Sequence, residues 1–203
     1  MFVADLAAGT PVPGGGSAAA MVGTLAAALA AMVGRFTIGR KRFAAVTDAA
    51  TAAVDLADQA RADLLALLDE DAIAYAGVVE AQKLPRDTDE QKAERSRLLQ
   101  RALTVSARVP LRIAERCAAL LPVTAEMARI GNPNLISDAG VASVLAEAGL
   151  QAAALNVRAN LFYISDASTR ATMKAELANY LRDAPVRRDE VLALVTQRLG
   201  DEG

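Results

Sequence analysis

Apolar residues recur at helical spacing along most of the chain. Between residues 43 and 84 an apolar stripe advances in steps of three and four, as on one face of an α-helix. No stretch of any length alternates apolar and polar residues with the period of a strand. The predicted helices lie at about 1–8, 17–34, 43–84, 88–121, 137–160, 169–181 and 188–199. The pattern predicts an all-α bundle of long, partly proline-kinked helices with shorter terminal helices.

Several residues carry the signals of helix ends. Thr88 and Gln91 have the spacing of a capping box, in which each side chain bonds the other residue's backbone amide. Ser17, or Gly16 before it, is expected to cap the apolar helix that runs to about residue 34. Pro110 should bend the long helix 88–121, and a second proline, at position 122, predicts another break or kink.

Composition supports one helical domain. The chain has 203 residues, of which 53% are hydrophobic, only 3% are aromatic and 47 are alanine. This length suits one domain with a real core, and alanine is the best helix former. Small alanine side chains also let helices pack closely.

The chain has no histidine, which excludes several kinds of site. Without histidine there is no Ser-His-Asp or Cys-His machinery, no histidine-ligated zinc and no Glu-x-x-His di-iron site. We therefore expect no metal site. The net charge of -2 does not favour nucleic-acid binding. The single cysteine, Cys117, cannot form an intrachain disulfide, so the predicted location is the cytoplasm.

One long uncharged stretch raises the question of a membrane span. No charged residue occurs between residues 6 and 34, and residues 17–34 approach the length of a span. The stretch consists largely of alanine and glycine, however, and Asp5 precedes it without a basic segment. We expect a buried helix and no membrane partner; a membrane-associated helical protein is the alternative.

A glycine-rich turn precedes this apolar helix. Pro13 is followed by Gly14, Gly15, Gly16 and Ser17, so backbone amides at a helix start lack shielding side chains. Such a segment suits an anionic group or a ligand that needs close backbone approach. The ordinary alternative is a flexible connector or a tight turn.

Two aspartates stand where a plain bundle does not need them. Asp71 lies on the apolar stripe, so it is either paired or capping a neighbouring loop, or it is the acid of a pocket. Ser137 suits the N-cap of the helix that follows, and Asp138 suits its first turn. They are equally a candidate acid or base, because a chain without histidine must transfer protons through Asp, Glu, Lys, Tyr, Cys or water.

Asn156 and Asn160 share one helical face four residues apart. They either bond a neighbouring helix or line a site that reads the polar edge of a heterocycle. Asp138 and Asn156 are 18 residues apart, which on a continuous helix is roughly 27 Å. Both cannot touch one reacting atom within one subunit, so the site is elongated or involves a subunit interface.

These motifs, taken in order, resemble the cyclodeaminase/cyclohydrolase family. That family comprises the cyclodeaminase part of formimidoyltransferase-cyclodeaminase and stand-alone methenyltetrahydrofolate cyclohydrolases. Arg40 and Phe43 replace the commoner Lys and Tyr of its basic motif. The matching segments are 10–19 (TPVPGGGSAA), 38–43 (IGRKRF), 71–75 (DAIAY), 81–85 (AQKLP), 109–111 (VPL), 131–132 (GN), 137–138 (SD) and 156–160 (NVRAN).

The resemblance implies a single domain over residues 1–203, strongest over 1–165, with further helices at 166–203. It implies a homodimer that acts on a tetrahydrofolate derivative, with or without a polyglutamate tail, and that needs no other cofactor. The implied reaction is either cyclodeamination of 5-formimidoyltetrahydrofolate or hydrolysis of the methenyl compound. A catalytically inactive bundle that binds a folate or a partner is the alternative.

The resemblance also suggests roles for the unusual polar residues. Asp138 is the first candidate for the acid or base, with Ser137 orienting it. Asp71 either binds the amino-pyrimidine edge of the pterin through paired hydrogen bonds or is itself the acid.

The remaining candidates would bind substrate. The backbone of residues 13–17 would hold it, and Arg40 and Lys41 would receive the glutamate tail, although a solvated basic cluster is the ordinary interpretation. Asn156 and Asn160 would line the pocket or the seam between two subunits.

Overall fold

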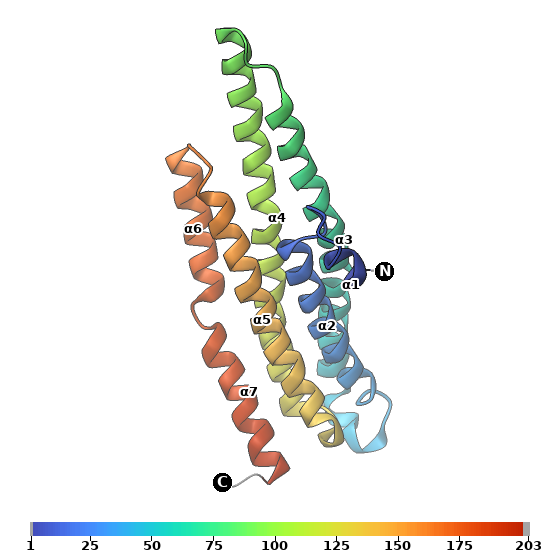
Figure 1. Cartoon of the computed structure of the whole chain (residues 1–203). Helices are drawn as coiled ribbons and strands as arrows, with labels where there is room; N and C mark the ends of the chain where they lie inside the picture. The colour runs from blue at the N-terminus through green and yellow to red at the C-terminus, as the bar shows by residue number, and fades with distance from the viewer. Residues whose placement is uncertain (1, 201–203) are drawn as a thin grey trace.

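The apolar helix near the N-terminus lies between two longer helices of the bundle (Figure 1). The computed structural model describes residues 2–200, so Met1 of the predicted first helix and residues 201–203 of the predicted domain lie outside it. Within residues 2–200 there is no strand, which confirms the all-α prediction. The α-helices are α1 (Phe2–Leu6), α2 (Gly15–Arg35), α3 (Thr47–Lys83), α4 (Asp89–Ile130), α5 (Ile136–Leu161), α6 (Ala167–Leu181) and α7 (Ala184–Leu199), with 3-10 turns η1 (Lys41–Val46) and η2 (Pro133–Leu135).

Four helices form the main bundle. The helix α2 packs against α3 and α5, while α4 packs against the same two helices. Because α3 and α4 have 37 and 42 residues against 21 in α2, they extend as an arm beyond the start of α2 (Figure 1). The helices α6 and α7 pack against α4 and α5. The start of α2 therefore lies part-way along the bundle, beside the base of the arm.

The helix boundaries confirm one predicted cap and correct two others. Thr88 and Gln91 form the predicted capping box at the start of α4. Gly14 caps α2 without a side-chain bond, so Ser17 lies inside the first turn and not at the cap. Ser137 likewise lies inside α5, which Leu135 precedes without a side-chain cap. In both cases the helix begins before the polar residue: Gly15 and Gly16 already belong to α2, and Ile136 already belongs to α5.

The helix α4 continues through both of its prolines. Pro110 and Pro122 each remove a backbone donor, which costs about 3 kcal/mol in a helix interior. Of the break or kink predicted at Pro122, the break is wrong: the helix continues, and the residues on either side, Leu121 and Val123, are buried in the core. Tertiary packing of this apolar face stabilises the helix more than the missing hydrogen bond destabilises it.

Small residues allow the central helices to approach closely. A Cβ atom added to Gly23 would lie 2.6 Å from Cys117 Sγ, and one added to Gly149 would lie 3.0 Å from the same sulfur. Cys117 is fully buried at this crossing of α2, α4 and α5, and burial raises the pKa of its thiol to about 12. The thiol is therefore neutral and packs as a small apolar group.

Two segments, Gly15–Arg35 and Pro133–Leu161, are long and apolar enough to cross a membrane by length and composition alone. Of their most apolar stretches, 61% and 50% of residues are buried inside the bundle. Central helices of a bundle commonly meet the same criteria, so the two segments are weak grounds for a span.

We expect Gly23→Ala to destabilise the protein. Overpacking at the Cys117 crossing should cost about 1–3 kcal/mol, which exceeds the roughly 0.5–1 kcal/mol that alanine gains over glycine in a helix. The matched control is Gly77→Ala in α3, where an added Cβ meets nothing within 4 Å. Urea unfolding should show a loss at Gly23 and a small gain at Gly77; equal effects at both positions would contradict the packing argument.

Candidate active site at the start of α2

A carboxylate from α3 caps the start of α2. The backbone N–H of Ser17 donates to Asp71 Oδ2 at 2.9 Å, and Ser17 Oγ lies 3.1 Å from that oxygen and 3.1 Å from the carbonyl of Leu68. A Cβ on Gly16 would lie 2.2 Å from Asp71 Oδ1, so only glycine admits the carboxylate here. The glycine-rich turn thus packs directly against the carboxyl of Asp71. The two roles predicted for Asp71, a cap for a neighbouring segment and the acid of a pocket, therefore both involve this contact.

Asp71 is poised to exchange a proton. Burial raises the pKa of its carboxyl above the ordinary 3.8, and the hydrogen bonds from Ser17 oppose this effect only in part. None of the ion pairs among residues 2–200 involves Asp71. A half-buried carboxyl with a raised pKa and no cationic partner is typical of an acid or base in a site.

Asn156 and Asn160 bring α5 to the same place. A Cβ on Gly15 would lie 3.1 Å from Asn156 Oδ1, which places this amide against the first turn of α2. Asn156 Nδ2 donates to the carbonyl of Ala152 in its own helix, at 2.9 Å. Asn160 Nδ2 donates to the carbonyl of Ser106 in α4, at 3.0 Å, which is one of the predicted interhelix bonds.

A hollow opens one helical turn beyond this cluster. It has a volume of about 380 Å³ and lies between α3, α4 and the end of α5; we call it the α3–α5 hollow. Tyr75 follows Asp71 by one turn, and Asn160 follows Asn156 in the same way, so the hollow continues directly from the cluster. Its lining includes Tyr75, Val78, Leu103, Ser106, Asn160 and Tyr163.

The sequence reasoning missed the tyrosines as site residues. Tyr75 belongs to the apolar stripe of its helix and to the segment 71–75 of the family resemblance, but no role in a site was predicted for it; it is 44% exposed and lines the hollow. Tyr163 lies at the other wall and is 62% exposed. Tyr163 lies beyond the end of α5, so no helical spacing links it to the other site residues. Tyr75 follows Asp71 by four residues, and this spacing places the two on one face of α3.

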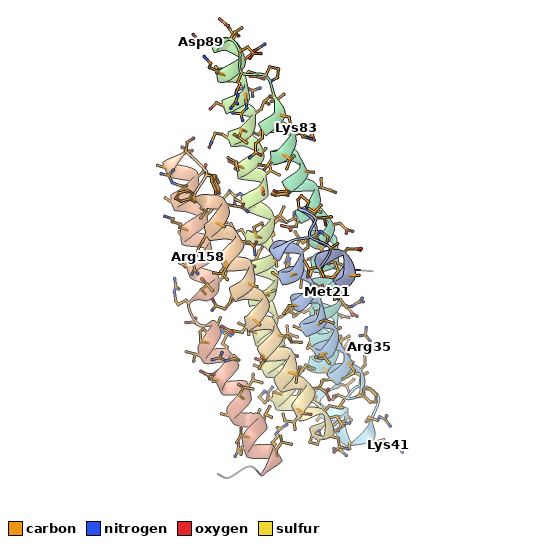
Figure 2. The ribbon with its side chains drawn as sticks, viewed as in Figure 1. Met21, Arg35, Lys41, Lys83, Asp89 and Arg158 are labelled. Atoms are coloured by element: carbon orange, nitrogen blue, oxygen red, sulfur yellow. The ribbon has the colours of Figure 1, made fainter. Side chains whose placement is uncertain are left out.

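Other predicted residues lie far from this cluster. Asp138 is in the first turn of α5, so roughly 27 Å of helix separates it from Asn156, and Ser137 is beside it. Arg40 and Lys41 lie beyond the far end of α2, whose 21 residues span about 30 Å (Figure 2). Within one chain, these four residues therefore form no single site with Asp71 and the start of α2.

Comparison with known proteins identifies the family. Residues 1–179 match the family model described as formiminotransferase-cyclodeaminase. The chain belongs to this family. Among residues 2–200, no three or more histidine, cysteine or carboxylate side chains lie together where they could hold a metal ion.

Relatives cover both branches of the family. A methenyltetrahydrofolate cyclohydrolase of Methylorubrum extorquens is 35% identical over 198 residues, which span 98% of this chain and 95% of that protein. A formimidoyltransferase-cyclodeaminase of Mus musculus is 36% identical over 97% of this chain, which spans only 36% of that longer protein. The crystal structure of a formiminotetrahydrofolate cyclodeaminase from Thermotoga maritima superposes with a TM-score of 0.81 at 30% identity, covering 98% of this chain and 94% of the other.

We expect Asp71→Asn to change how stability depends on pH. A raised carboxyl pKa means that the folded protein holds a proton that the unfolded chain releases, so this contribution is present below pH 3.8 and is lost as pH rises through the folded pKa. The unfolding free energy of the wild type relative to Asp71→Asn should therefore fall with rising pH in urea titrations.

Asp58 supplies a control of opposite sign. Burial raises the pKa of Asp58, but its bonds to Arg35 and Arg61 outweigh burial and hold the pKa below the ordinary value. Stability of the wild type relative to Asp58→Asn should rise with pH over the same range. If both variants gave the same slope, the assignment for Asp71 would be wrong.

Proposed function

We propose that this chain is an enzyme of one-carbon folate metabolism, either a formimidoyltetrahydrofolate cyclodeaminase or a methenyltetrahydrofolate cyclohydrolase. The relatives of similar length support both activities, since one is named a cyclohydrolase and another a cyclodeaminase. The observation that carries the proposal is the carboxyl of Asp71, which is bound to the first turn of α2 and lies one helical turn before Tyr75 of the α3–α5 hollow.

The two reactions share one carbon atom between N5 and N10 of the folate. In cyclodeamination, N10 attacks the formimidoyl carbon on N5, the five-membered ring closes, and ammonia leaves. In hydrolysis, water attacks the methenyl carbon, the bond from that carbon to N5 breaks, and 10-formyltetrahydrofolate forms. Both pass through a tetrahedral carbon and both need a group that moves protons in a fixed position. One site can therefore serve either reaction.

Asp71 is the group assigned to proton transfer. As an acid it protonates the departing amine of the formimidoyl group, and as a base it takes the proton of the attacking water. Its raised pKa brings both protonation states closer to working pH than for an ordinary aspartate. Ser17 fixes the carboxyl by two contacts, so the proton is exchanged at a defined position.

The α3–α5 hollow is assigned to the pterin. Its volume of about 380 Å³ lies at the lower end of the range for small-molecule sites. Tyr75 and Tyr163 offer ring faces, and the amides of Asn156 and Asn160 offer donors and acceptors for a heterocycle.

The assembly and location are further proposals. We propose a homodimer, as the family resemblance implies, and a cytoplasmic location, as the single cysteine favours. An exposed apolar groove of about 550 Å³ on the arm supports a subunit contact, because Ile73 and Val105 in it are 71% and 51% exposed. Light scattering tests the subunit number, and cell fractionation tests the location.

Replacing the two candidate acids separately tests the assignment. Asp71→Asn keeps an oxygen for the Ser17 amide but cannot exchange a proton, so turnover should fall about 10²-fold to 10⁴-fold. Asp138→Asn is the matched comparison at the other end of α5. A folded Asp71→Asn variant with full activity would overturn the role of Asp71; loss of activity in both would indicate a site shared between subunits.

Purified protein supplied with both substrates separates the two activities. Ammonia release from the 5-formimidoyl compound reports cyclodeamination, and loss of methenyl absorbance reports hydrolysis. If the protein bound folate but converted neither substrate, the result would favour the alternative, a catalytically inactive helical bundle that binds a folate.

Gly16→Ala tests whether the fit between Asp71 and α2 matters for turnover. The added methyl group would displace the carboxyl, because it would lie 2.2 Å from Asp71 Oδ1, so we expect a loss of turnover similar to that of Asp71→Asn. Gly14→Ala is the control, since its Cβ would meet only the carbonyl oxygen of Pro11 at 3.7 Å. Equal activity in the two variants would contradict the assigned geometry.

A further inference from the structure

A second hollow lies on the opposite flank of α5 and is basic. It has a volume of about 470 Å³ and is lined by Arg158, Leu161, Phe162, Arg170 and Lys174, from the end of α5 and from α6; we call it the basic hollow. Arg158 follows Asn156 by two residues and therefore points about 200° away around the helix. The basic hollow and the α3–α5 hollow thus flank one helix, and Figure 2 shows Arg158 on the side facing α6.

The cations of the basic hollow lack the interhelix ion pairs that several other arginines of the bundle make. Arg108, Arg112 and Arg116 each pair with a carboxylate of another helix, and so does Arg188. Within residues 2–200, no carboxylate pairs with Arg158 or Lys174. Uncompensated charges that converge on one concave surface favour an anionic ligand.

Arg170 is held in place at the edge of the same hollow. Its Nη1 atom donates to the carbonyls of Ile164 and Ser165, at 2.5 and 3.0 Å, in the turn that joins α5 to α6. Carbonyl groups do not neutralise the guanidinium, but the exposed carboxylate of Asp166, at the N-cap of α6, interacts with it and offsets part of its charge. The hollow therefore combines one fixed cation with two exposed ones.

An apolar strip joins the two hollows across the outer face of α5. Leu155 and Phe162 are 65% and 82% exposed, and Ala159 lies between them on the same face. Phe162 and Tyr163 pack edge to face with ring centres 5.2 Å apart. Tyr163 lines the α3–α5 hollow and Phe162 lines the basic hollow, so this aromatic pair connects them.

We propose that the basic hollow binds the glutamate carboxylates of the folate whose pterin occupies the α3–α5 hollow. The inference rests on the proposed function. Across α5, the surface changes from amides through an apolar strip to cations, in the order in which a folate changes from pterin through its benzoyl ring to its glutamates. A helix with side chains is about 10–12 Å wide, a width that the benzoyl ring and its amide link can cross. Each additional γ-linked glutamate adds one carboxylate for Arg158, Arg170 and Lys174.

The test compares monoglutamate and polyglutamate forms of one substrate in the double variant Arg158→Ala/Lys174→Ala. Loss of two charge-assisted contacts should raise KM for the polyglutamate about tenfold or more, with a much smaller rise for the monoglutamate and less effect on kcat than on KM. Added salt should weaken binding of the polyglutamate by the wild type and have less effect on the variant. Arg158→Lys should restore most of the difference.

Two further double variants serve as comparisons. Arg86→Ala/Arg187→Ala removes the same charge from exposed cations elsewhere and should leave the ratio of KM values unchanged. Arg40→Ala/Lys41→Ala tests the competing assignment at the far end of α2. If this pair, and not Arg158 and Lys174, controls the polyglutamate preference, the proposal is overturned.

Two other results bear on the proposal and on the function separately. An unchanged ratio of KM values together with an altered subunit number in Arg158→Ala/Lys174→Ala would assign this face to a subunit contact and overturn the tail site. If the wild type turned over neither substrate, the proposed function would fail. Equilibrium binding of polyglutamate and monoglutamate tetrahydrofolate to both proteins would then decide the tail site alone.

Discussion

The contact between Asp71 and the first turn of α2 is the constraint around which the site is organised. A helix start leaves backbone amides without intrahelical partners, and α2 begins at glycines that offer no side-chain cap. A carboxyl from the neighbouring helix α3 accepts one of these amides, and Gly16 leaves the room that it needs. The contact therefore caps the start of α2. It leaves the carboxyl half-buried, and this burial raises the pKa of Asp71 although the hydrogen bonds from Ser17 oppose the effect.

Because α2 begins at this level and not earlier, a hollow remains above its first turn. The helices α3 and α4 continue past the start of α2, and α5 ends beside them, so the place that a longer α2 would fill is the α3–α5 hollow (Figure 1). Close packing of Gly23, Gly149 and Cys117 fixes α2 against α4 and α5 below this level. The rigid crossing therefore holds the start of α2 at a set height along the bundle, and the site stands on rigid elements.

The helix α5 divides the surface by chemistry. One flank presents the asparagine amides to the start of α2, the outer face is apolar, and the other flank presents cations toward α6. Because a helix turns by about 100° per residue, neighbours such as Asn156, Arg158 and Phe162 serve three different environments. A single short segment thus presents polar, apolar and charged side chains on three different faces.

Local pattern determined the helices, the all-α fold and the family, because periodicity, caps and ordered motifs are properties of short segments. It also identified Asp71 and the glycine turn, since a carboxylate on an apolar stripe and bare amides are visible without coordinates. Only the tertiary structure decided which candidates meet. Asp71 joins residues 14–17 because α2 starts beside the middle of α3, whereas Asp138 and Arg40 lie at the opposite end of the bundle. That outcome depends on how far each helix extends, and the unbroken passage of α4 through Pro122 shows that packing, not local signals, sets this length.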